Sequence, residues 1–556
     1  MRPRALAEAG VLVLLTWIAV GVLDGQRGLW QDDAQVLFRQ FAAAGPWWRR
    51  LFLPYASPAR RLVGLPFEAA LWTAWPLPVL YGLLGAAWLA TGLLARSIAL
   101  RLWRGLPGVG FLAAVFTVSA TSDFFTSSLV ALHYVLSIAA ALGALVALID
   151  WTRHGGTWRL ALMAAGLVTA FLLTDAPLSV YLFGPLLLVA RPLARRPTEP
   201  RRVVVGLAVW YAAAVPYLLL VLPAAFDPSS YLSHAMRPMS PGAWAMRLLD
   251  LVGYNLTPWR WSEGRPLWFP REELVLDPVA RVGLAVVGAS VAAVLFARGL
   301  PRDGGDGPAR GGRAALVVAL LAVAANGVYV TVTLSEFYCR THLLSRVWAS
   351  LLMAAALAWC ATHGRTAGLA AAVAACQWSA VGLLGGLERQ DYFAGHWRRH
   401  RTELQSLRAA APGLEPDARV LLRVTRRSGF VSTDAGYLAR AWMTLLHADP
   451  TLECRVVLWA DGRPTTCEAA GPALVCRGER SPDCVRREGR SEDVLPLDRL
   501  VWLDYDAQRR RFQLRRSLPA DLDPTGAYAP GALIVDHPLP TLARVLFDRP
   551  RGSFVP

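Results

Sequence analysis

Long apolar runs recur through the first two-thirds of this chain, and they constrain its fold more than any other feature. About eleven can be marked: 9–23, 77–100, 109–119, 127–149, 158–173, 178–189, 203–224, 282–296, 314–332, 343–359 and 367–384. A membrane-crossing helix needs about 20 predominantly apolar residues. Charged residues make up 17% of the chain, whereas about 25% is usual in soluble proteins. The sequence therefore predicts an α-helical polytopic membrane protein with about 11 transmembrane helices.

The basic residues are concentrated in the short connections between apolar runs. The net charge is +17, and every one of the 57 Lys and Arg residues is Arg. A basic chain can indicate nucleic-acid binding, but Arg in short loops is how membrane proteins fix their orientation, so we exclude nucleic acid as a partner. Three connections carry most of this charge: Arg96, Arg101 and Arg104; Arg191, Arg195, Arg196, Arg201 and Arg202; and Arg298, Arg302, Arg310 and Arg313.

This Arg distribution predicts a cytoplasmic N-terminus, and an odd number of spans then places the C-terminal part outside. The first long loop disagrees, because its arginines would be external. Either the topology is inverted, or those arginines have another role, such as binding an anionic lipid. The expected location is a multi-pass protein of the cell's inner or plasma membrane.

Cysteine usage favours the first topology. Four of the seven Cys lie in the polar C-terminal part: Cys454, Cys467, Cys476 and Cys484. An even, closely spaced set is typical of disulfides in an oxidising compartment. Zinc is the competing interpretation, but the spacing contains no C-x-x-C pair. The sequence predicts disulfides without deciding their connectivity.

Two domains are expected. Residues 1–387 form a transmembrane domain with long outer loops at 26–76 and 226–277, and residues 388–556 form a small extracytoplasmic α/β domain. In the second, periodicity predicts helices at 396–410 and 434–449, strands at 418–424 and 454–462, and a hairpin from 498–506 and 509–516. This part has no Gly-rich phosphate loop and no nucleophile elbow, so we expect support or binding from it rather than chemistry.

An acidic pair, Asp32 and Asp33, follows the first apolar run directly. A carboxylate beside the membrane surface can act as a catalytic base and deprotonate an acceptor hydroxyl. The alternative is helix capping, since acids suit the first turn of a helix. Asp123 and Asp175 lie at other span ends, on the same expected outer face, where ionisable residues are functional candidates or simply solvated.

The segment 335–348 places Glu336, Arg340, His342 and Arg346 in one short outer turn. Arg is well suited to bind phosphate with two hydrogen bonds. The alternative is anchoring at the membrane interface by Arg and aromatic residues. Arg60 and Arg61 in the first loop have the same two interpretations.

This order of features resembles the class C (GT-C) glycosyltransferases, which use polyprenyl-phosphate sugars. Their members have a first span, a long outer loop that opens with an acidic pair, an interfacial helix, about eleven or more spans and often an outer C-terminal domain. The similar segments here are Asp32–Asp33, residues 172–188 around Asp175, and residues 337–348; Asp123 falls where some members have a second acid. Ala34 stands where the family usually has an aromatic residue.

The resemblance implies transfer of a sugar, with inversion, from a polyprenyl-phosphate donor to an extracytoplasmic lipid, glycan or protein. Asp32 or Asp33 would be the base, and Asp123 and Asp175 would be second-acid or metal candidates. The donor phosphate would bind to residues drawn from Arg60, Arg61, Arg340, His342 and Arg346. A divalent cation, Mg²⁺ or Mn²⁺, is compatible with these acids but not required.

The alternative is a non-catalytic membrane protein, either a lipid or polysaccharide transporter or a scaffold with an outer partner-binding domain. A transporter is expected to place ionisable residues near the middle of its spans, whereas the acids here gather at span ends. A ligase or polymerase of lipid-linked glycans is a third interpretation, and it differs mainly in the acceptor.

Overall fold

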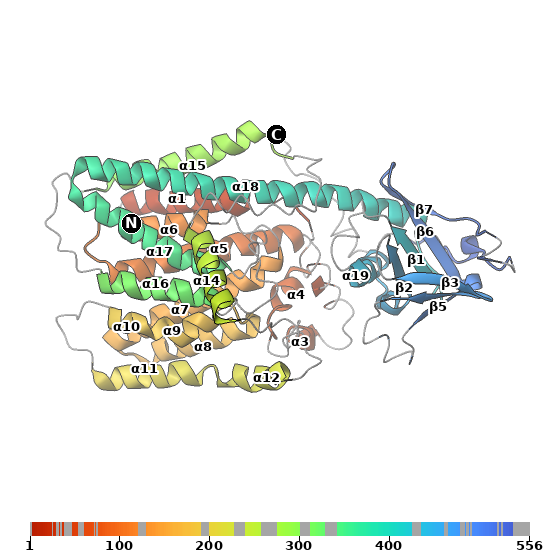
Figure 1. Cartoon of the computed structure of the whole chain (residues 1–556), viewed down its shortest axis with the longest axis horizontal. Coiled ribbons are helices and arrows are strands. Elements are labelled where there is room, and N and C mark those ends of the chain that lie inside the picture. Colours follow the sequence, from red (N-terminus) through yellow and green to blue (C-terminus); the bar gives the residue numbers. More distant parts are fainter. Residues whose placement is uncertain are drawn as a thin grey trace.

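The structure is a computed structural model of the 556-residue chain. It describes residues 3–24, 26–28, 33, 36–37, 40, 47–53, 60–71, 73, 76–120, 129–190, 199–226, 240–256, 275–300, 312–327, 342–424, 435–460, 465–478, 484, 489, 492–519, 522–523 and 526–537. The described chain is mostly helical, and its strands are confined to the C-terminal part (Figure 1).

Within the described ranges, 7 helical segments are long and apolar enough to cross a membrane. They are α1 (Pro3–Val20), α5 (Pro76–Leu102), α7 (Leu132–His154), α11 with α12 (Pro200–Ala212 and Val215–Phe226), α15 (Pro278–Arg298), α17 (Leu343–Cys360) and α18 (Arg365–Ala410). Shorter apolar helices are α6 (Val109–Ser119), α8 (Thr157–Leu173), α9 with α10 (Leu178–Phe183 and Leu187–Ala190) and α16 (Gly312–Gly327). These long apolar helices support the prediction of a membrane protein.

Tight turns and close helix contacts bring these helices together. Gly155 and Gly156 have φ angles of 66° and 91° in the turn that joins α7 to α8, a conformation that glycine adopts without steric cost. Where α18 passes α6, a Cβ on Gly382 would lie 2.4 Å from the Ser119 carbonyl oxygen. Small residues at such crossings are typical of packed membrane helices. Apolar side chains on the outer helices remain exposed, for example Val279 at 79%, as expected of a surface that faces lipid.

The C-terminal part contains two sheets. The first has the order β2-β1-β6-β7, in which β2 (Val456–Ala460), β1 (Arg419–Val424) and β6 (Leu500–Asp506) are parallel and β7 (Arg511–Leu514) is antiparallel. The second is antiparallel, with the order β3-β4-β5: Thr466–Ala470, Ala473–Arg477 and Asp493–Pro496. Helix α19 (Ala435–His447) connects β1 to β2. The predicted small α/β region is thus confirmed, and the second sheet was not predicted.

Side chains of β1 that point alternately to the two faces of the sheet explain how the layers pack. Val420 and Leu422 belong to the core shared with α19 and α18, whereas Leu421 belongs to a second core under the three-stranded sheet. Successive strand residues point to opposite faces of a sheet, so β1 contributes to both cores. The four-stranded sheet therefore lies between helices and the small antiparallel sheet.

Helix α18 joins the two parts of the chain. Its 46 residues span about 69 Å at 1.5 Å per residue, and it runs from the helical bundle to the strands (Figure 1). The Tyr505 hydroxyl donates to Glu403 at 2.8 Å, and the Phe512 amide donates to Ser406 at 2.9 Å. The expected boundary between residues 387 and 388 falls inside this helix.

Both disulfides predicted from cysteine spacing are present, and the structure gives their pairing. Cys467 bonds to Cys476 at directly facing positions of β3 and β4. Cys454 bonds to Cys484 across a sequence separation of 30 residues.

Candidate active site at the strand-facing end of the bundle

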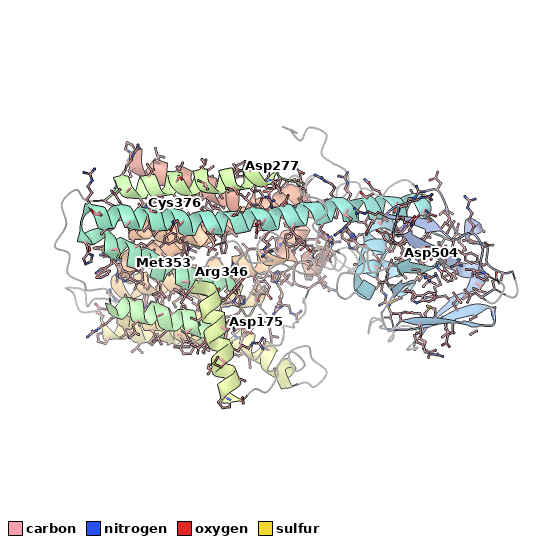
Figure 2. All side chains as sticks on the ribbon, turned by 45° about the horizontal axis from the view of Figure 1, so that its top comes forward. Asp175, Asp277, Arg346, Met353, Cys376 and Asp504 are labelled. Atoms are coloured by element: carbon pink, nitrogen blue, oxygen red, sulfur yellow. A yellow bond between two sulfur atoms is a disulfide. The ribbon has the colours of Figure 1, made fainter. Side chains whose placement is uncertain are left out.

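Three chain segments carry the predicted site residues that the structure describes. Short helices α3 (Trp47–Arg50) and α4 (Leu65–Leu71) of the first long loop lie between the bundle and the strands (Figure 1). Because α18 runs toward the strands and a tight turn joins it to α17, α17 begins at the strand-facing end. Figure 2 places Arg346 and Asp175 between Met353 and Asp504 along the long axis.

Asp33 is completely buried, with a relative exposure of 0%. It has helical backbone conformation and acts electrostatically on the Tyr81 hydroxyl. That hydroxyl donates to the Gly28 carbonyl at 2.7 Å, and the Arg27 guanidinium lies 4.1 Å from the centre of the Tyr81 ring. Arg27 also forms an ion pair with Asp24, yet burial outweighs this cation and raises the pKa of Asp24.

The segment that leads to the acidic pair is held against α18. The side-chain amide of Gln390 donates to the Ile18 carbonyl at 2.8 Å and accepts from the Leu23 amide at 3.2 Å. A Cβ on Gly28 would lie only 1.9 Å from the Trp397 indole. Only glycine fits at this position, so the segment before the acidic pair packs closely against α18. Asp32 lies outside the described residues.

Arg60 and Asp175 form an ion pair with an N–O distance of 2.7 Å. The Thr174 hydroxyl donates to the same carboxylate at 2.9 Å, and the Leu62 amide donates to the Leu172 carbonyl at 3.0 Å. Burial alone would raise the pKa of Asp175, but Arg60 and Thr174 together hold it below its usual value. Two residues for which the sequence predicts separate roles thus contact each other and join the first loop to the end of α8.

The remaining predicted site residues are distributed as follows. Arg61 follows Arg60 in sequence and is partly buried. Asp123 and Arg340 lie outside the described residues. In the ranges that the structure does describe, no three His, Cys, Asp or Glu side chains gather as a metal ion would require.

A buried polar cluster, which we call the amide–histidine cluster, lies where α14 (Pro241–Leu256) meets α16 and α17. Asn255, Asn326 and His342 form its hydrogen bonds, and Ser345 follows His342 by three residues on α17; each of the four is 2% exposed or less. The Asn255 side-chain nitrogen lies 3.0 Å from Asn326 Oδ1 and 3.1 Å from His342 Nδ1. These contacts join residues 71 and 87 positions apart in sequence.

Arg346 lies beside the amide–histidine cluster. It donates to the Tyr254 hydroxyl at 3.1 Å, and its guanidinium lies 5.3 Å from the centre of the Tyr254 ring. Burial and the nearby Arg346 charge lower the pKa of His342, which precedes α17, to about 3. His342 is therefore neutral at physiological pH.

Sequence reasoning identified His342 and Arg346 but missed Asn255, Asn326 and Tyr254. Asn326 had a recognisable signal, because an amide inside an apolar helix usually bonds to a neighbouring helix. Asn255 lies in an amphipathic segment, and nothing in that segment distinguishes a buried amide from a surface one.

Comparisons with protein-family models, with curated proteins and with solved structures found no match to this chain.

Proposed function

We propose that this protein is an integral-membrane glycosyltransferase that moves a sugar from a polyprenyl-phosphate donor to an extracytoplasmic acceptor, with inversion at the anomeric carbon. One observation supports this most. Asp33 is buried, Arg60 pairs with Asp175, and Figure 2 places both Asp175 and Arg346 between Met353 and Asp504 along the long axis. A carboxylate and cations at one water-poor position are what sugar transfer from a lipid phosphate requires.

The roles follow from this chemistry. Asp32 or Asp33 accepts the proton of the acceptor hydroxyl, whose oxygen attacks the anomeric carbon while the bond to the lipid phosphate breaks. Arg346, with Arg340 and Arg61 from the adjacent segments, stabilises the negative charge on the departing phosphate. Arg60 has a lesser part in phosphate binding than the sequence suggests, because Asp175 already neutralises its charge. A divalent cation held by Asp123 or Asp175 would supply further charge stabilisation.

We further propose that the chain crosses the membrane eleven times, with a cytoplasmic N-terminus and an extracytoplasmic strand region. Counting the 7 long and the 4 shorter apolar helical segments supports this number. The N-terminus lies at the end of the bundle away from the strands (Figure 1). Disulfides in the strand region support an oxidising compartment.

The placement of ionisable residues favours a transferase over a transporter. At the N-terminal end of the bundle, Glu8 forms an ion pair with Arg96 at 2.7 Å, and Arg101 binds Asp150 at 2.5 Å. The pair formed by Asp175 lies at the opposite end. Transporters place such groups near the middle of the bilayer, whereas these described pairs lie at the helix ends.

The test is transfer in membranes supplied with polyprenyl-phosphate sugars. Asp32→Asn or Asp33→Asn should abolish transfer while protein level and membrane insertion stay normal. Asp277→Asn is the matched control, because this exposed acid caps α15 by accepting from the Val279 amide at 2.8 Å and has no role in the chemistry. Transfer at the wild-type rate by both site variants would exclude the acidic pair as the base.

A further inference from the structure

Three buried polar atoms of the amide–histidine cluster have no hydrogen-bond partner in the described structure. They are Asn255 Oδ1, His342 Nε2 and Ser345 Oγ. Their residues are 2%, 2% and 1% exposed, so solvent does not satisfy them. Because buried polar groups are normally hydrogen-bonded, these atoms at the junction of α14 and α17 are candidates for contact with a bound polar molecule.

The neighbouring hydrogen bonds decide what each atom needs. Asn255 Nδ2 faces the Leu251 carbonyl at 2.9 Å and Asn326 Oδ1 at 3.0 Å. Asn326 is fixed in turn by its own donation to the Ala322 carbonyl at 2.8 Å. The Asn255 side-chain atom that faces these two oxygens must therefore be the amide nitrogen. The other atom, Asn255 Oδ1, is an acceptor that needs a donor.

The same network assigns the tautomer of His342. Its Nδ1 lies 3.1 Å from Asn255 Nδ2, an amide nitrogen that donates and does not accept. Nδ1 therefore carries no proton, and neutral His342 has its proton on Nε2. His342 Nε2–H is a donor that needs an acceptor. Ser345 lies one turn further along α17, and its hydroxyl can either donate or accept a hydrogen bond.

A ligand for this cluster must both donate and accept hydrogen bonds. A phosphodiester offers only acceptor oxygens, so it cannot satisfy Asn255 Oδ1. A sugar hydroxyl both donates and accepts. We propose that Asn255, His342 and Ser345 bind hydroxyl groups of the donor's sugar ring. This inference builds on the proposed function and moves His342 from the phosphate to the sugar. Arg346 follows His342 by four residues on the same helix face and keeps the phosphate role proposed above.

The test compares two ligands on the full-length protein in phosphatidylcholine nanodiscs: polyprenyl phosphate, and the same lipid phosphate esterified to mannose, glucose or arabinose. At least one sugar ester should bind more tightly than the bare phosphate. Ser345→Ala should weaken binding of that ester about five- to tenfold. This change corresponds to the loss of one hydrogen bond of about 1.0–1.4 kcal/mol. Binding of bare polyprenyl phosphate should not change, and Ser345→Thr, which keeps the hydroxyl, should restore the ester's affinity.

Ser350→Ala is the matched control. This serine is also 1% exposed and on α17, but it lies eight residues beyond His342, about 12 Å deeper along the helix. Its removal should leave both affinities unchanged. His342→Phe removes the Nε2 donor and should weaken ester binding at least as much as Ser345→Ala does.

Three results would overturn the proposal. Equal weakening of both ligands would place the phosphate at the cluster, and unchanged binding in Ser345→Ala and His342→Phe would mean that the cluster holds only water. Sugar esters that bind no more tightly than the bare phosphate would also exclude a sugar subsite. Transfer is measured separately. If the variants selectively lose ester binding but the wild-type protein transfers no sugar, the sugar subsite is retained and the transferase is rejected.

Discussion

Removal of the two disulfides should destabilise the strand region by different amounts. Cys454 and Cys484 are 30 residues apart in sequence, and Cys467 and Cys476 are 9 apart. A disulfide restricts the unfolded chain more when it closes a longer loop. The chain-entropy relation gives about 3.6 kcal/mol for the longer loop and about 2.6 kcal/mol for the shorter one.

The assay is pulse proteolysis of the full-length protein in detergent across a urea series, with cleavage of the strand region scored on gels. With a urea dependence of about 2 kcal/mol per molar, the midpoint should fall by about 1.8 M in the Cys454→Ala/Cys484→Ala variant and by about 1.3 M in the Cys467→Ala/Cys476→Ala variant. Reduction of the wild-type protein should lower the midpoint further than either double variant does.

Each double variant should respond to reductant only through its remaining disulfide, and a variant without all four cysteines should not respond. A larger loss from the 9-residue loop than from the 30-residue loop would refute the loop-entropy reasoning. Insensitivity of the wild-type midpoint to reductant would show that the bonds do not form in the protein.

Three further outcomes are expected. Gly28→Ala should lower the melting temperature, because its Cβ would lie 1.9 Å from the Trp397 indole and overpacking costs about 1–3 kcal/mol; Gly82→Ala, with nothing within 4 Å of its Cβ, should not. Because the pKa of Asp175 is held below its usual value, its stabilising effect is present above the unfolded-state pKa and is lost as pH falls through the lower folded-state value. Asp175→Asn should therefore lower thermal stability at neutral pH and flatten its decline on acidification. A membrane-impermeant maleimide should label the four strand-region cysteines in intact cells only after reduction. Labelling without reductant would contradict the disulfides, and labelling only after cell lysis would contradict the topology.

The predictable part of the fold is the part that depends on hydrophobicity. The apolar run 109–119 corresponds to α6, and the alternating strand 418–424 contains β1. The sheet β3-β4-β5 was missed, since β3 is mostly exposed and its pairing with β4 is reinforced by Cys467–Cys476. The length of α18 was missed for a related reason. Its hydrophobic pattern ends near residue 387, and its polar half is stabilised by contacts with distant strands.

The candidate site shows a similar division. Sequence reasoning identified Asp33, Arg60, Asp175 and Arg346 from residue type and span-end position. It could not predict that Arg60 pairs with Asp175, which is 115 residues away. Spacing along a chain indicates which residues share a helix face, but not which helices pack together. The amide–histidine cluster depends on three helices meeting, so its hydrogen bonds become visible only in the folded structure.

Sugar transfer by the purified protein tests the central proposal most directly. Wild-type protein, reconstituted in liposomes with polyprenyl-phosphate sugars and an extract of envelope acceptors, should release polyprenyl phosphate and form a glycoside of inverted configuration. Asp32→Asn or Asp33→Asn should retain donor binding but release no polyprenyl phosphate. Release at the wild-type rate by both variants, or no glycoside from the wild-type protein with any donor, would contradict the proposed glycosyltransferase.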